Sequence, residues 1–426
     1  MEKSPGLFHL QLIEMKRWLA VGLFGLGALR PLAADTAAVL PFLNKTAKAP
    51  NLDWIGESVA ETIREALGTT GVMTLDRNEV QEAYRRLALR EGIALTEASV
   101  MKIGETLDAE QIVYGSFEFT PAATGAITSG SLHVTARVLD RHHMRASPEF
   151  TETGALQDLA TIEAHLAWRA LNLIAPTMAP PESEFRSLRT PIRLEAEESY
   201  VRGLLAHTTE QKEKYFSQAA RVDPKFAHAC YQLGQIHYQR KEYRQAVAWL
   251  EKVGLGDIHS HEASFLLGLA RFQTGDYKGA QQTFQMIAAA VPLSEVFNNL
   301  GAAESRAGMQ QIAIDDFHKA LAGDANDPVY RFNLGYALWR KGDFAAAAEA
   351  FRASLDLDPN DLAAPLLLAR CLKKQGPHSS PDSRLDNLER LKTNFEERAF
   401  MQLKLLLAPG TAPAIPRLED FKMDRR

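Results

Sequence analysis

Residues 299–301 read Asn-Leu-Gly, and residues 333–335 read the same three residues 34 positions later. Gly234 and Gly268 extend this spacing toward the N-terminus, so that successive marker glycines lie 34, 33 and 34 residues apart. An alanine follows each marker glycine after twelve residues, and a large apolar residue follows that alanine after four. These positions are Gly234, Gly268, Gly301 and Gly335, then Ala246, Ala280, Ala313 and Ala347, then Leu250, Phe284, Phe317 and Phe351. Two markers in phase on a period near 34 predict helix-turn-helix repeats over residues 193–376.

The markers and the turns between them resemble the tetratricopeptide repeat family. Helix-breaking pairs recur in phase, at Gly275-Asp276 and Gly342-Asp343 within repeats and at Asp327-Pro328 and Asp358-Pro359 between them. The resemblance implies five to six helix pairs stacked into a superhelical solenoid that binds other proteins. Small residues at the markers let paired helices approach closely, and the phenylalanines fill the space toward the next repeat.

The end of the repeats is expected to be covered, because a terminal repeat otherwise leaves an apolar face bare. We expect capping helices within residues 377–408, at Leu385–Phe395 and Glu397–Leu407. Prolines at 409, 413 and 416 then favour an extended tail over residues 409–426.

The N-terminal part, residues 35–175, alternates between strand and helix patterns. Strands are expected at 37–43, 72–75, 112–119, 131–139 and 147–153, and helices at 54–67, 77–90, 97–107 and 156–174. Alternation of this kind predicts a layered α/β domain with a mixed sheet, so that the whole chain is of the α+β class.

Four stretches in this domain carry a second resemblance. Ala38-Val39-Leu40-Pro41-Phe42-Leu43-Asn44, Trp54-Ile55-Gly56-Glu57-Ser58, Ile112-Val113-Tyr114-Gly115-Ser116-Phe117 and residues 132–140 follow one another. This order resembles the N-terminal domain of the TolB translocation protein and its relatives in flagellar and curli outer-membrane assembly. It implies an envelope protein that binds other proteins, although the propeller of the translocation protein is absent here.

Residues 176–192 contain four prolines and are expected to form a linker between the two domains. At the N-terminus, Met15-Lys16-Arg17 precedes an apolar run from Trp18 to Leu29 and then small residues up to Ala34. This order is that of a secretory signal, so we expect residues 1–34 to be removed, with Met15 as the true start. The alternative is an uncleaved anchor. Because no cysteine lies near the cleavage site, lipidation is not expected, and the protein is expected in the periplasm or outside the cell.

Composition supports a soluble globular protein that does not bind nucleic acid. Apolar residues make up 46% of the chain and charged residues 24%, and the formal charge is −5. Only Cys230 and Cys371 are present, four repeats apart. We therefore expect two buried thiols and no disulfide between them.

The first helix of each pair lines the inner side of a repeat stack, where partner segments bind. Counting along each first helix predicts a groove rich in aromatic and arginine side chains, which dominate binding energy at interfaces. The predicted partner-binding residues are Tyr231, Gln235, Tyr238, Phe265, Phe272, Asn298, Arg306, Phe332, Tyr336, Trp339 and Arg340. The alternative is that several of these rings pack between neighbouring helices or under the N-terminal domain.

Asn299 and Asn333 precede their Leu-Gly markers, and in peptide-clamping relatives an asparagine at this place contacts the ligand backbone. The alternative is that each is a common repeat residue without that role. The lysines of a carboxylate clamp are missing, which argues against capture of a C-terminal carboxylate.

Two short sequence fragments resemble metal-binding motifs but lack residues that those motifs require. His261-Glu262 begins a zinc helix pattern, but residue 265 is Phe where a second His is required. The stretch Asp356–Asn360 lacks the glycine and the glutamate of a calcium loop. We therefore expect no catalytic, metal or cofactor site. The sequence favours a non-enzymatic scaffold of the bacterial cell envelope that binds a protein or peptide. The alternative is a sensory module that binds a small ligand at the α/β domain or its seam with the repeats.

Overall fold

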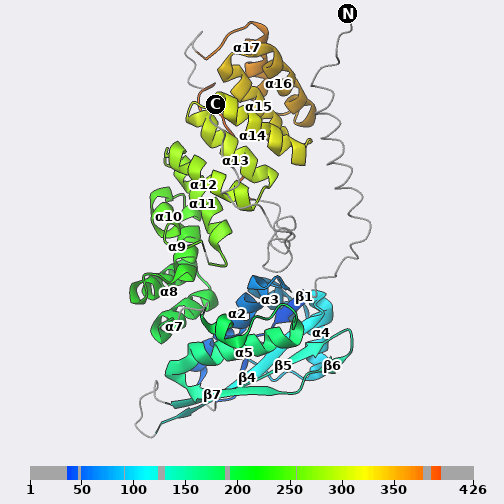
Figure 1. The fold of residues 1–426 in the computed structure, drawn as a ribbon, viewed down its shortest axis with the longest axis vertical. Coiled ribbons are helices and arrows are strands. Elements are labelled where there is room, and N and C mark those ends of the chain that lie inside the picture. The colour runs from blue at the N-terminus through cyan, green and yellow to red at the C-terminus, as the bar shows by residue number, and fades with distance from the viewer. Residues whose placement is uncertain are drawn as a thin grey trace, which may run out of the picture.

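The computed structural model describes residues 36–46, 49–90, 92–122, 130–187, 192–255, 257–377 and 385–394. The expected signal segment, the helix 397–407 and the tail 409–426 lie outside these residues. A mixed sheet with covering helices forms the N-terminal part, and helical repeats stack on it toward the C-terminus (Figure 1). None of the described helices has the length and apolar character needed to cross a membrane.

The sheet is mixed, as the sequence predicted. The described residues form one sheet of seven strands with the path β3-β1-β4-β5-β6, in which β2 also pairs with β4 and β7 with β5. Its long central pair, β4 (Gln111–Pro121) and β5 (Gly130–Asp140), is antiparallel, whereas β1 (Thr36–Val39) is parallel to β3 (Met73–Thr74) and β4. The remaining strands are β2 (Leu43–Asn44), β6 (Arg145–Ala146) and β7 (Phe150–Ala155). Parallel and antiparallel pairing therefore meet at β4.

Helices cover both faces of this sheet because successive side chains of a strand point to opposite faces. In β1, Ala37 and Val39 pack under α2 (Trp54–Thr69) and α5 (Leu159–Ile174). Ala38 instead packs under α3 (Arg77–Arg86) and α4 (Glu97–Leu107). The sheet thus has an apolar core on each side.

The repeat region consists of helices in sequential contact, each packing on the next from α7 to α17 (Figure 1). The first helices of the pairs are α7 (Leu194–Leu205), α9 (Ala227–Gln239), α11 (Ser260–Gln273), α13 (Ser294–Arg306) and α15 (Pro328–Lys341). Their partners are α8 (Thr209–Val222), α10 (Tyr243–Leu250), α12 (Tyr277–Ala290), α14 (Gln310–Gly323) and α16 (Phe344–Leu357), and α17 (Ala364–Leu372) follows.

The marker residues form the packing contact inside each pair. A Cβ added at Gly301 would lie 2.9 Å from the ring of Phe317, and one at Gly268 would lie 2.7 Å from the ring of Phe284. Phe284, Phe317 and Phe351 thus each lie on the glycine of the first helix of their own repeat. In the turns, Gly275, Gly308 and Gly342 adopt positive φ angles of 85°, 84° and 94°, which glycine reaches without strain.

The repeats and the α/β domain share one apolar core. Helix α7 packs against α2, and the cluster that contains Ile55 also contains Tyr200 of α7 and Phe216 of α8. Polar contacts add to this seam, since Ser58 donates a hydrogen bond to Glu197 at 3.0 Å and Arg202 donates one to the carbonyl of Asn51 at 2.8 Å.

The proline-rich stretch between the domains differs from expectation. A short helix, α6 (Glu182–Ser187), forms directly after Pro181, where a proline at a helix start removes no hydrogen bond. Phe185 of this helix is 5% exposed and belongs to the shared core, so the described part of the stretch packs on the protein.

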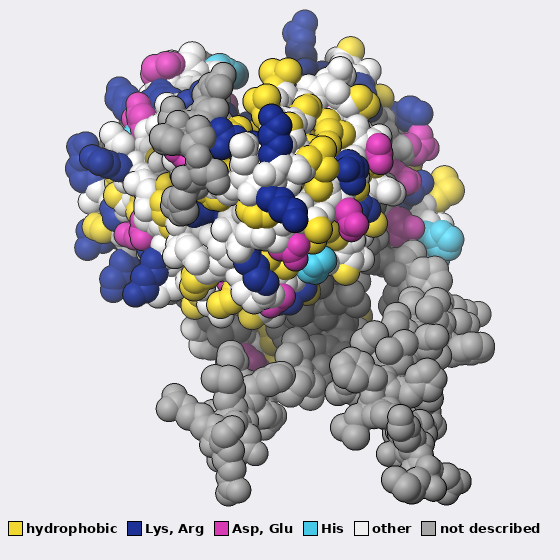
Figure 2. Space-filling view, turned by 90° about the horizontal axis from the view of Figure 1, so that it is seen from above, with side chains coloured by type: hydrophobic (Ala, Val, Ile, Leu, Met, Phe, Trp, Pro, Cys, Tyr) yellow, Lys and Arg dark blue, Asp and Glu magenta, His cyan; other side chains and the backbone are white. Residues whose placement is uncertain are grey.

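The prediction of a capping helix at Leu385–Phe395 is wrong. Residues 386–394 form no helix. The backbone groups of Arg390 and Lys392 are bound to asparagine side chains of α13 and α15, which prevents them from forming helical hydrogen bonds. At the same end of the molecule, Leu362, Leu366 and Leu372 are 88%, 51% and 61% exposed, and hydrophobic side chains gather on the face seen from above (Figure 2).

Candidate functional site

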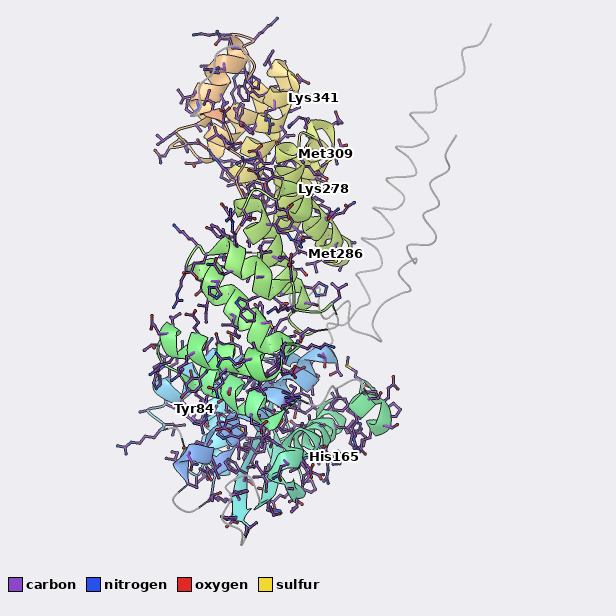
Figure 3. The ribbon with its side chains drawn as sticks, turned by 90° about the vertical axis from the view of Figure 1, so that its left-hand side faces the viewer. Tyr84, His165, Lys278, Met286, Met309 and Lys341 are labelled. Atoms are coloured by element: carbon purple, nitrogen blue, oxygen red, sulfur yellow. The ribbon has the colours of Figure 1, made fainter. Side chains whose placement is uncertain are left out.

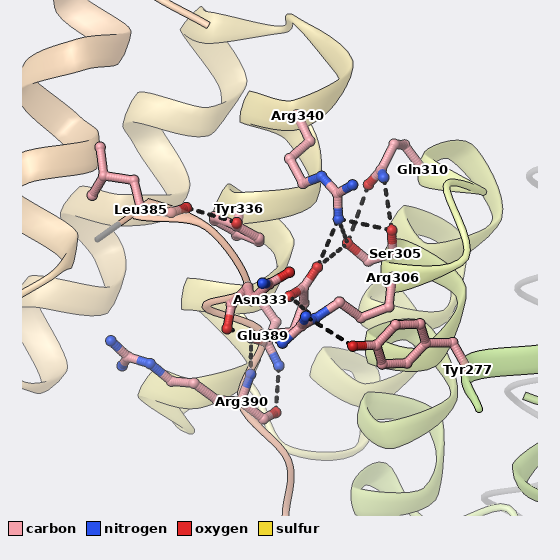
Figure 4. Close-up of polar contacts among 11 residues, drawn as sticks. Tyr277, Ser305, Arg306, Gln310, Asn333, Tyr336, Arg340, Leu385, Glu389 and Arg390 are labelled. Carbon is pink, nitrogen blue, oxygen red and sulfur yellow. Dashed lines mark hydrogen bonds and ion pairs between the residues drawn. The ribbon is translucent and has the colours of Figure 1, made fainter. Parts of the chain in front are cut away.

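Residues 385–394, which we call the strap, cross the first helices α13 and α15 (Figure 4). Asn333 accepts a 2.9 Å hydrogen bond from the backbone N–H of Arg390 and donates one of 2.7 Å to the carbonyl of the same residue. Asn299 makes the same pair of bonds with Lys392, at 2.8 Å each. Each side-chain amide therefore holds one residue of an extended chain through both of its backbone groups, as a neighbouring strand would.

A third asparagine connects this pair. Asn298 accepts a hydrogen bond from Asn333 at 2.8 Å and donates one to the carbonyl of Arg390 at 3.0 Å. All three asparagines are completely buried. Because buried amide groups cost free energy unless they are paired, the strap backbone is part of what stabilises this row.

An acidic side chain of the strap binds two arginines of the repeats. The Glu389 side chain is fully buried and lies 2.6 Å from Arg306 Nε and 2.8 Å from Arg340 Nη1. Ser305 donates a further hydrogen bond to it at 2.8 Å. A charge-assisted hydrogen bond such as the one from Arg340 is about twice as strong as a neutral one, and the ion pair with Arg306 adds a second cation that compensates the buried carboxylate.

Basic side chains of the strap bind acids at the far edge. Arg390 lies 2.9 Å from Asp361 and stacks over the ring of Phe332, with its Cζ atom 3.4 Å from the ring centroid. Although burial alone would raise the pKa of Asp361, hydrogen bonds from Arg390 and from two backbone N–H groups lower it. Lys392 makes an ion pair with Asp327.

Apolar and backbone contacts complete the strap interface. Leu385 is 3% exposed within the core of the repeats, and Leu388 and Leu391 pack against the same core. The Tyr336 hydroxyl donates a 2.8 Å hydrogen bond to the carbonyl of Leu385. Burial, with a smaller contribution from the nearby Glu389 carboxylate, raises the pKa of Tyr336 to about 12, so this hydroxyl stays a donor at neutral pH.

Six predicted groove residues lie against the strap or against Gln375, which comes before it in the sequence. Asn298, Arg306, Phe332, Tyr336 and Arg340 contact the strap, and the Trp339 indole donates a 2.8 Å hydrogen bond to the carbonyl of Gln375, which precedes it.

The five predicted residues of α9 and α11 lie elsewhere along the same row of first helices. Tyr231 stacks on His259 and accepts a hydrogen bond from Gln235, and Tyr238 meets Tyr243 edge to face. Phe265 and Phe272 are 2% and 6% exposed, and Phe272 packs on Tyr277 below the Arg306 guanidinium. Their rings are thus largely engaged with neighbouring helices.

Sequence reasoning missed several residues of this site. For Asn299 and Asn333 only the resemblance to peptide-clamping relatives suggests a contact, and the sequence does not mark Asp327 or Asp361 as partners of another segment. The Asn-Leu-Gly repetition was the available signal for the asparagines. No local pattern marks residues 385–394 as their ligand, because the pairs are separated by 57 residues or more.

A separate cavity of about 460 Å³ lies in the α/β domain. Its lining includes Tyr84 of α3, Tyr114 of β4, Arg137 of β5 and Leu205 of α7, so it reaches the seam with the repeats. Figure 3 labels Tyr84 in this part of the molecule. Within the described ranges, His, Cys, Asp and Glu side chains form no group of three that suits a metal ion. The two thiols are free and buried, as predicted.

Comparisons with known proteins agree with the repeat assignment. Tetratricopeptide repeat models match residues 213–256, 262–294 and 328–361. None of them matches the α/β domain, so its resemblance to the TolB domain stays a prediction. The search of curated proteins finds no match.

Solved structures that are similar to this chain include MamA residues 41 to the end from Desulfovibrio magneticus RS-1, with 24% identity over 39% of this chain and 97% of that one, and a TM-score of 0.35. YrrB, described as a tetratricopeptide protein with an unusual peptide-binding site, shares 17% identity over 50% of this chain and 91% of its own, with a TM-score of 0.36. PcrH, solved with the chaperone-binding region of PopB, shares 24% identity over 28% and 96%, with a TM-score of 0.25. The C-terminal half of the chain carries tetratricopeptide repeats.

Proposed function

We propose that this protein is a non-enzymatic scaffold of the bacterial cell envelope that binds an extended segment of a partner protein along the first helices of its repeats. The observation that carries this proposal is the asparagine row. Asn299 and Asn333 each bind both backbone groups of one residue in an extended segment. These hydrogen bonds do not depend on the side chain of the residue that is bound. A surface built in this way has the chemistry to hold a peptide.

The α/β domain supports the proposal as a second docking part. Because α2, α5 and α7 share one core, a partner held by the repeats would keep a defined position relative to this domain. Its resemblance to the TolB domain favours docking of an envelope protein, and the signal-like segment 1–34 favours export. Both belong to the proposal.

Site-specific photo-crosslinking in the native cell tests this function. A photoreactive residue replaces Gln235 of α9 in one variant, and in the matched control it replaces Met286, which is 43% exposed on α12 (Figure 3). We expect one discrete adduct from position 235, mapped by mass spectrometry to a single partner segment, and none from position 286. Equal adducts from both positions would contradict a specific groove.

A second candidate function rests on the cavity of the α/β domain. Its volume lies in the range of small-molecule sites, and Arg137 and Tyr114 place polar groups in its lining. Under this alternative the domain binds a small ligand and acts as a sensor. A thermal-shift screen with metabolites distinguishes the two, because a ligand raises the melting temperature only if it binds the folded chain. A rise that is lost in Arg137→Ala favours the sensor.

A further inference from the structure

The partner surface of α13 and α15 is occupied by the chain itself. We propose that the strap is a built-in competitor for this surface, and that the partner segment which displaces it carries the same chemistry: an acidic residue followed directly by arginine, in extended chain. This inference rests on the proposed function, because it names the partner chemistry and the regulation of the same site.

The acidic residue sets the first requirement on the partner. Arg306 and Arg340 are 12% and 28% exposed and both point at the Glu389 carboxylate (Figure 4). These exposures include the cover that the strap itself provides, so a partner segment that takes its place buries the two guanidinium groups again and has to supply their compensating charge. A segment without an acid at this place would leave them unpaired, whereas a segment with Glu or Asp restores the arrangement.

The basic residue sets the second requirement. Arg390 lies between the Phe332 ring and Asp361, a position that combines a cation–π contact with an ion pair. Because its planar fork can bond a carboxylate and stack on a ring at the same time, lysine is a poorer substitute here. The order acid then arginine therefore fixes the direction in which a partner binds.

The asparagine row sets the third requirement, on the backbone. The N–H groups of Arg390 and Lys392 donate to Asn333 and Asn299. These strap residues are two apart, as alternate residues of an extended chain are when they face one side. A partner therefore needs an extended run without proline at these two places, since proline has no N–H to donate.

Covalent attachment makes the strap a strong competitor. It belongs to the same chain as the surface, and a tethered segment acts at an effective concentration of about a millimolar when its connection spans the gap. A free segment of equal intrinsic affinity therefore binds weakly to the native chain. Weakening the strap, without touching the repeats, exposes the surface.

The test is a titration of full-length chains with a fluorescein-labelled peptide that carries the sequence of residues 385–394. The variant Glu389→Ala removes the buried acid of the strap, and Asp386→Ala is the matched control because it removes an exposed acid three residues earlier. Lys392→Pro is a second strap variant that leaves every repeat residue intact. Circular dichroism checks that each variant keeps native helicity. Hydrogen exchange at the Arg390 amide reports release of the strap in every chain, and exchange at residue 392 reports it in the chains that keep lysine there.

We expect the peptide to bind Glu389→Ala and Lys392→Pro about ten-fold or more tightly than the native chain and Asp386→Ala, since the tethered competitor is then weakened. A peptide with lysine in place of its glutamate should bind none of them. Equal binding to all chains would overturn the competitor role while leaving peptide binding by the repeats intact. No binding to variants whose strap exchanges freely would overturn the peptide-binding surface of the proposed function itself.

Discussion

At the scale of single residues, side-chain amides of the repeats bind the strap backbone as a neighbouring strand would. Asn299 and Asn333 occupy the position before the Leu-Gly marker in successive repeats, so the repeat period places them one above the other on α13 and α15. They bind Lys392 and Arg390, which are two residues apart in the strap. The position before the marker thus contributes to binding, while the marker itself contributes to packing.

We predict that Asn333→Ala loosens the strap. The change removes two hydrogen bonds to Arg390. Asn298 still donates to the Arg390 carbonyl, but the Arg390 N–H loses its acceptor, which costs about 1–3 kcal/mol. Hydrogen exchange at the Arg390 amide should therefore accelerate by about ten-fold or more. The control Asn326→Ala changes an exposed asparagine in the loop before α15 and should leave this exchange rate unchanged. An unchanged rate in Asn333→Ala would show that the asparagine pair does not hold the strap.

A second prediction at this scale concerns the marker glycines. Gly301→Val should lower the free energy of unfolding by about 1–3 kcal/mol, because added atoms would meet the Phe317 ring where no space remains. Gly254→Val is the control, since a Cβ there meets nothing within 4 Å. Urea denaturation followed by circular dichroism measures both. Equal midpoints for the two variants would mean that the α13–α14 contact tolerates a larger residue.

At the scale of elements, the seam between α2, α5 and α7 contains a pair of buried acids. Thr62 donates a hydrogen bond to Glu163 of α5 at 3.2 Å, and Ser58 donates one to Glu197 of α7. Burial raises the pKa of Glu163 well above its ordinary value, and the charge of Glu197 adds to the shift. Burial also raises the pKa of Glu197.

These acids make the stability of the seam depend on pH. In the folded chain Glu163 keeps a proton that the unfolded chain releases above about pH 4.5, the ordinary value of this group. The folded state therefore binds more protons, and its stability falls as pH rises through the window between the ordinary and the raised pKa.

We predict that Glu163→Gln, which resembles the protonated acid, stabilises the chain above this window. The gain over the native chain should be small near pH 4 and grow toward pH 8, at up to about 1.4 kcal/mol for each pH unit inside the window. Glu184→Gln, an exposed site on α6, serves as the control. Thermal melts from pH 4 to pH 8 measure the difference. A gain of the same size at every pH would argue against proton uptake at this pair.

Local sequence pattern predicts some elements of this chain and fails for the strap. The helical repeats over residues 193–376 and the long strands β4 and β5 match the sequence patterns, because periodicity reflects burial of one face against adjacent elements. The single strand expected at 37–43 is instead two strands, β1 and β2, and the helix expected at 77–90 ends at Arg86. The segment around Glu389 also has leucines at helical spacing, at 385, 388 and 391. In the folded chain they pack on the repeats, although residues 386–394 form no helix. Spacing alone does not separate these two arrangements.

At the scale of the whole molecule, the α/β domain and the first repeat behave as one packed unit, while the far repeats hold the strap. Tyr200 and Phe216 belong to the same core as Ile55, so separation of the two domains would expose apolar surface. A partner bound on α13 and α15 would therefore be presented at a set distance from the α/β domain.

Export is the prediction that belongs to the whole chain. We expect a chain with a C-terminal tag to reach the periplasm with Asp35 as its first residue, measured by intact-protein mass spectrometry of the fractionated cells. Leu23→Arg interrupts the apolar run and should leave the uncut chain in the cytoplasm. Native chain recovered uncut from the cytoplasm would contradict the proposed envelope location.

The amino-acid sequence by itself determined the repeat period, the marker contacts, the α+β class and the set of residues on the inner helices. These properties are local, because each helix or strand repeats the pattern of the surface that it buries. Only the tertiary structure decided what those inner residues bind. The contacts of Asn299 with Lys392 and of Arg340 with Glu389 join positions 93 and 49 residues apart. Such pairs depend on the path of the folded chain, which places the strap against asparagine and arginine side chains of the repeats. The repeat period predicts only that these side chains lie in one row.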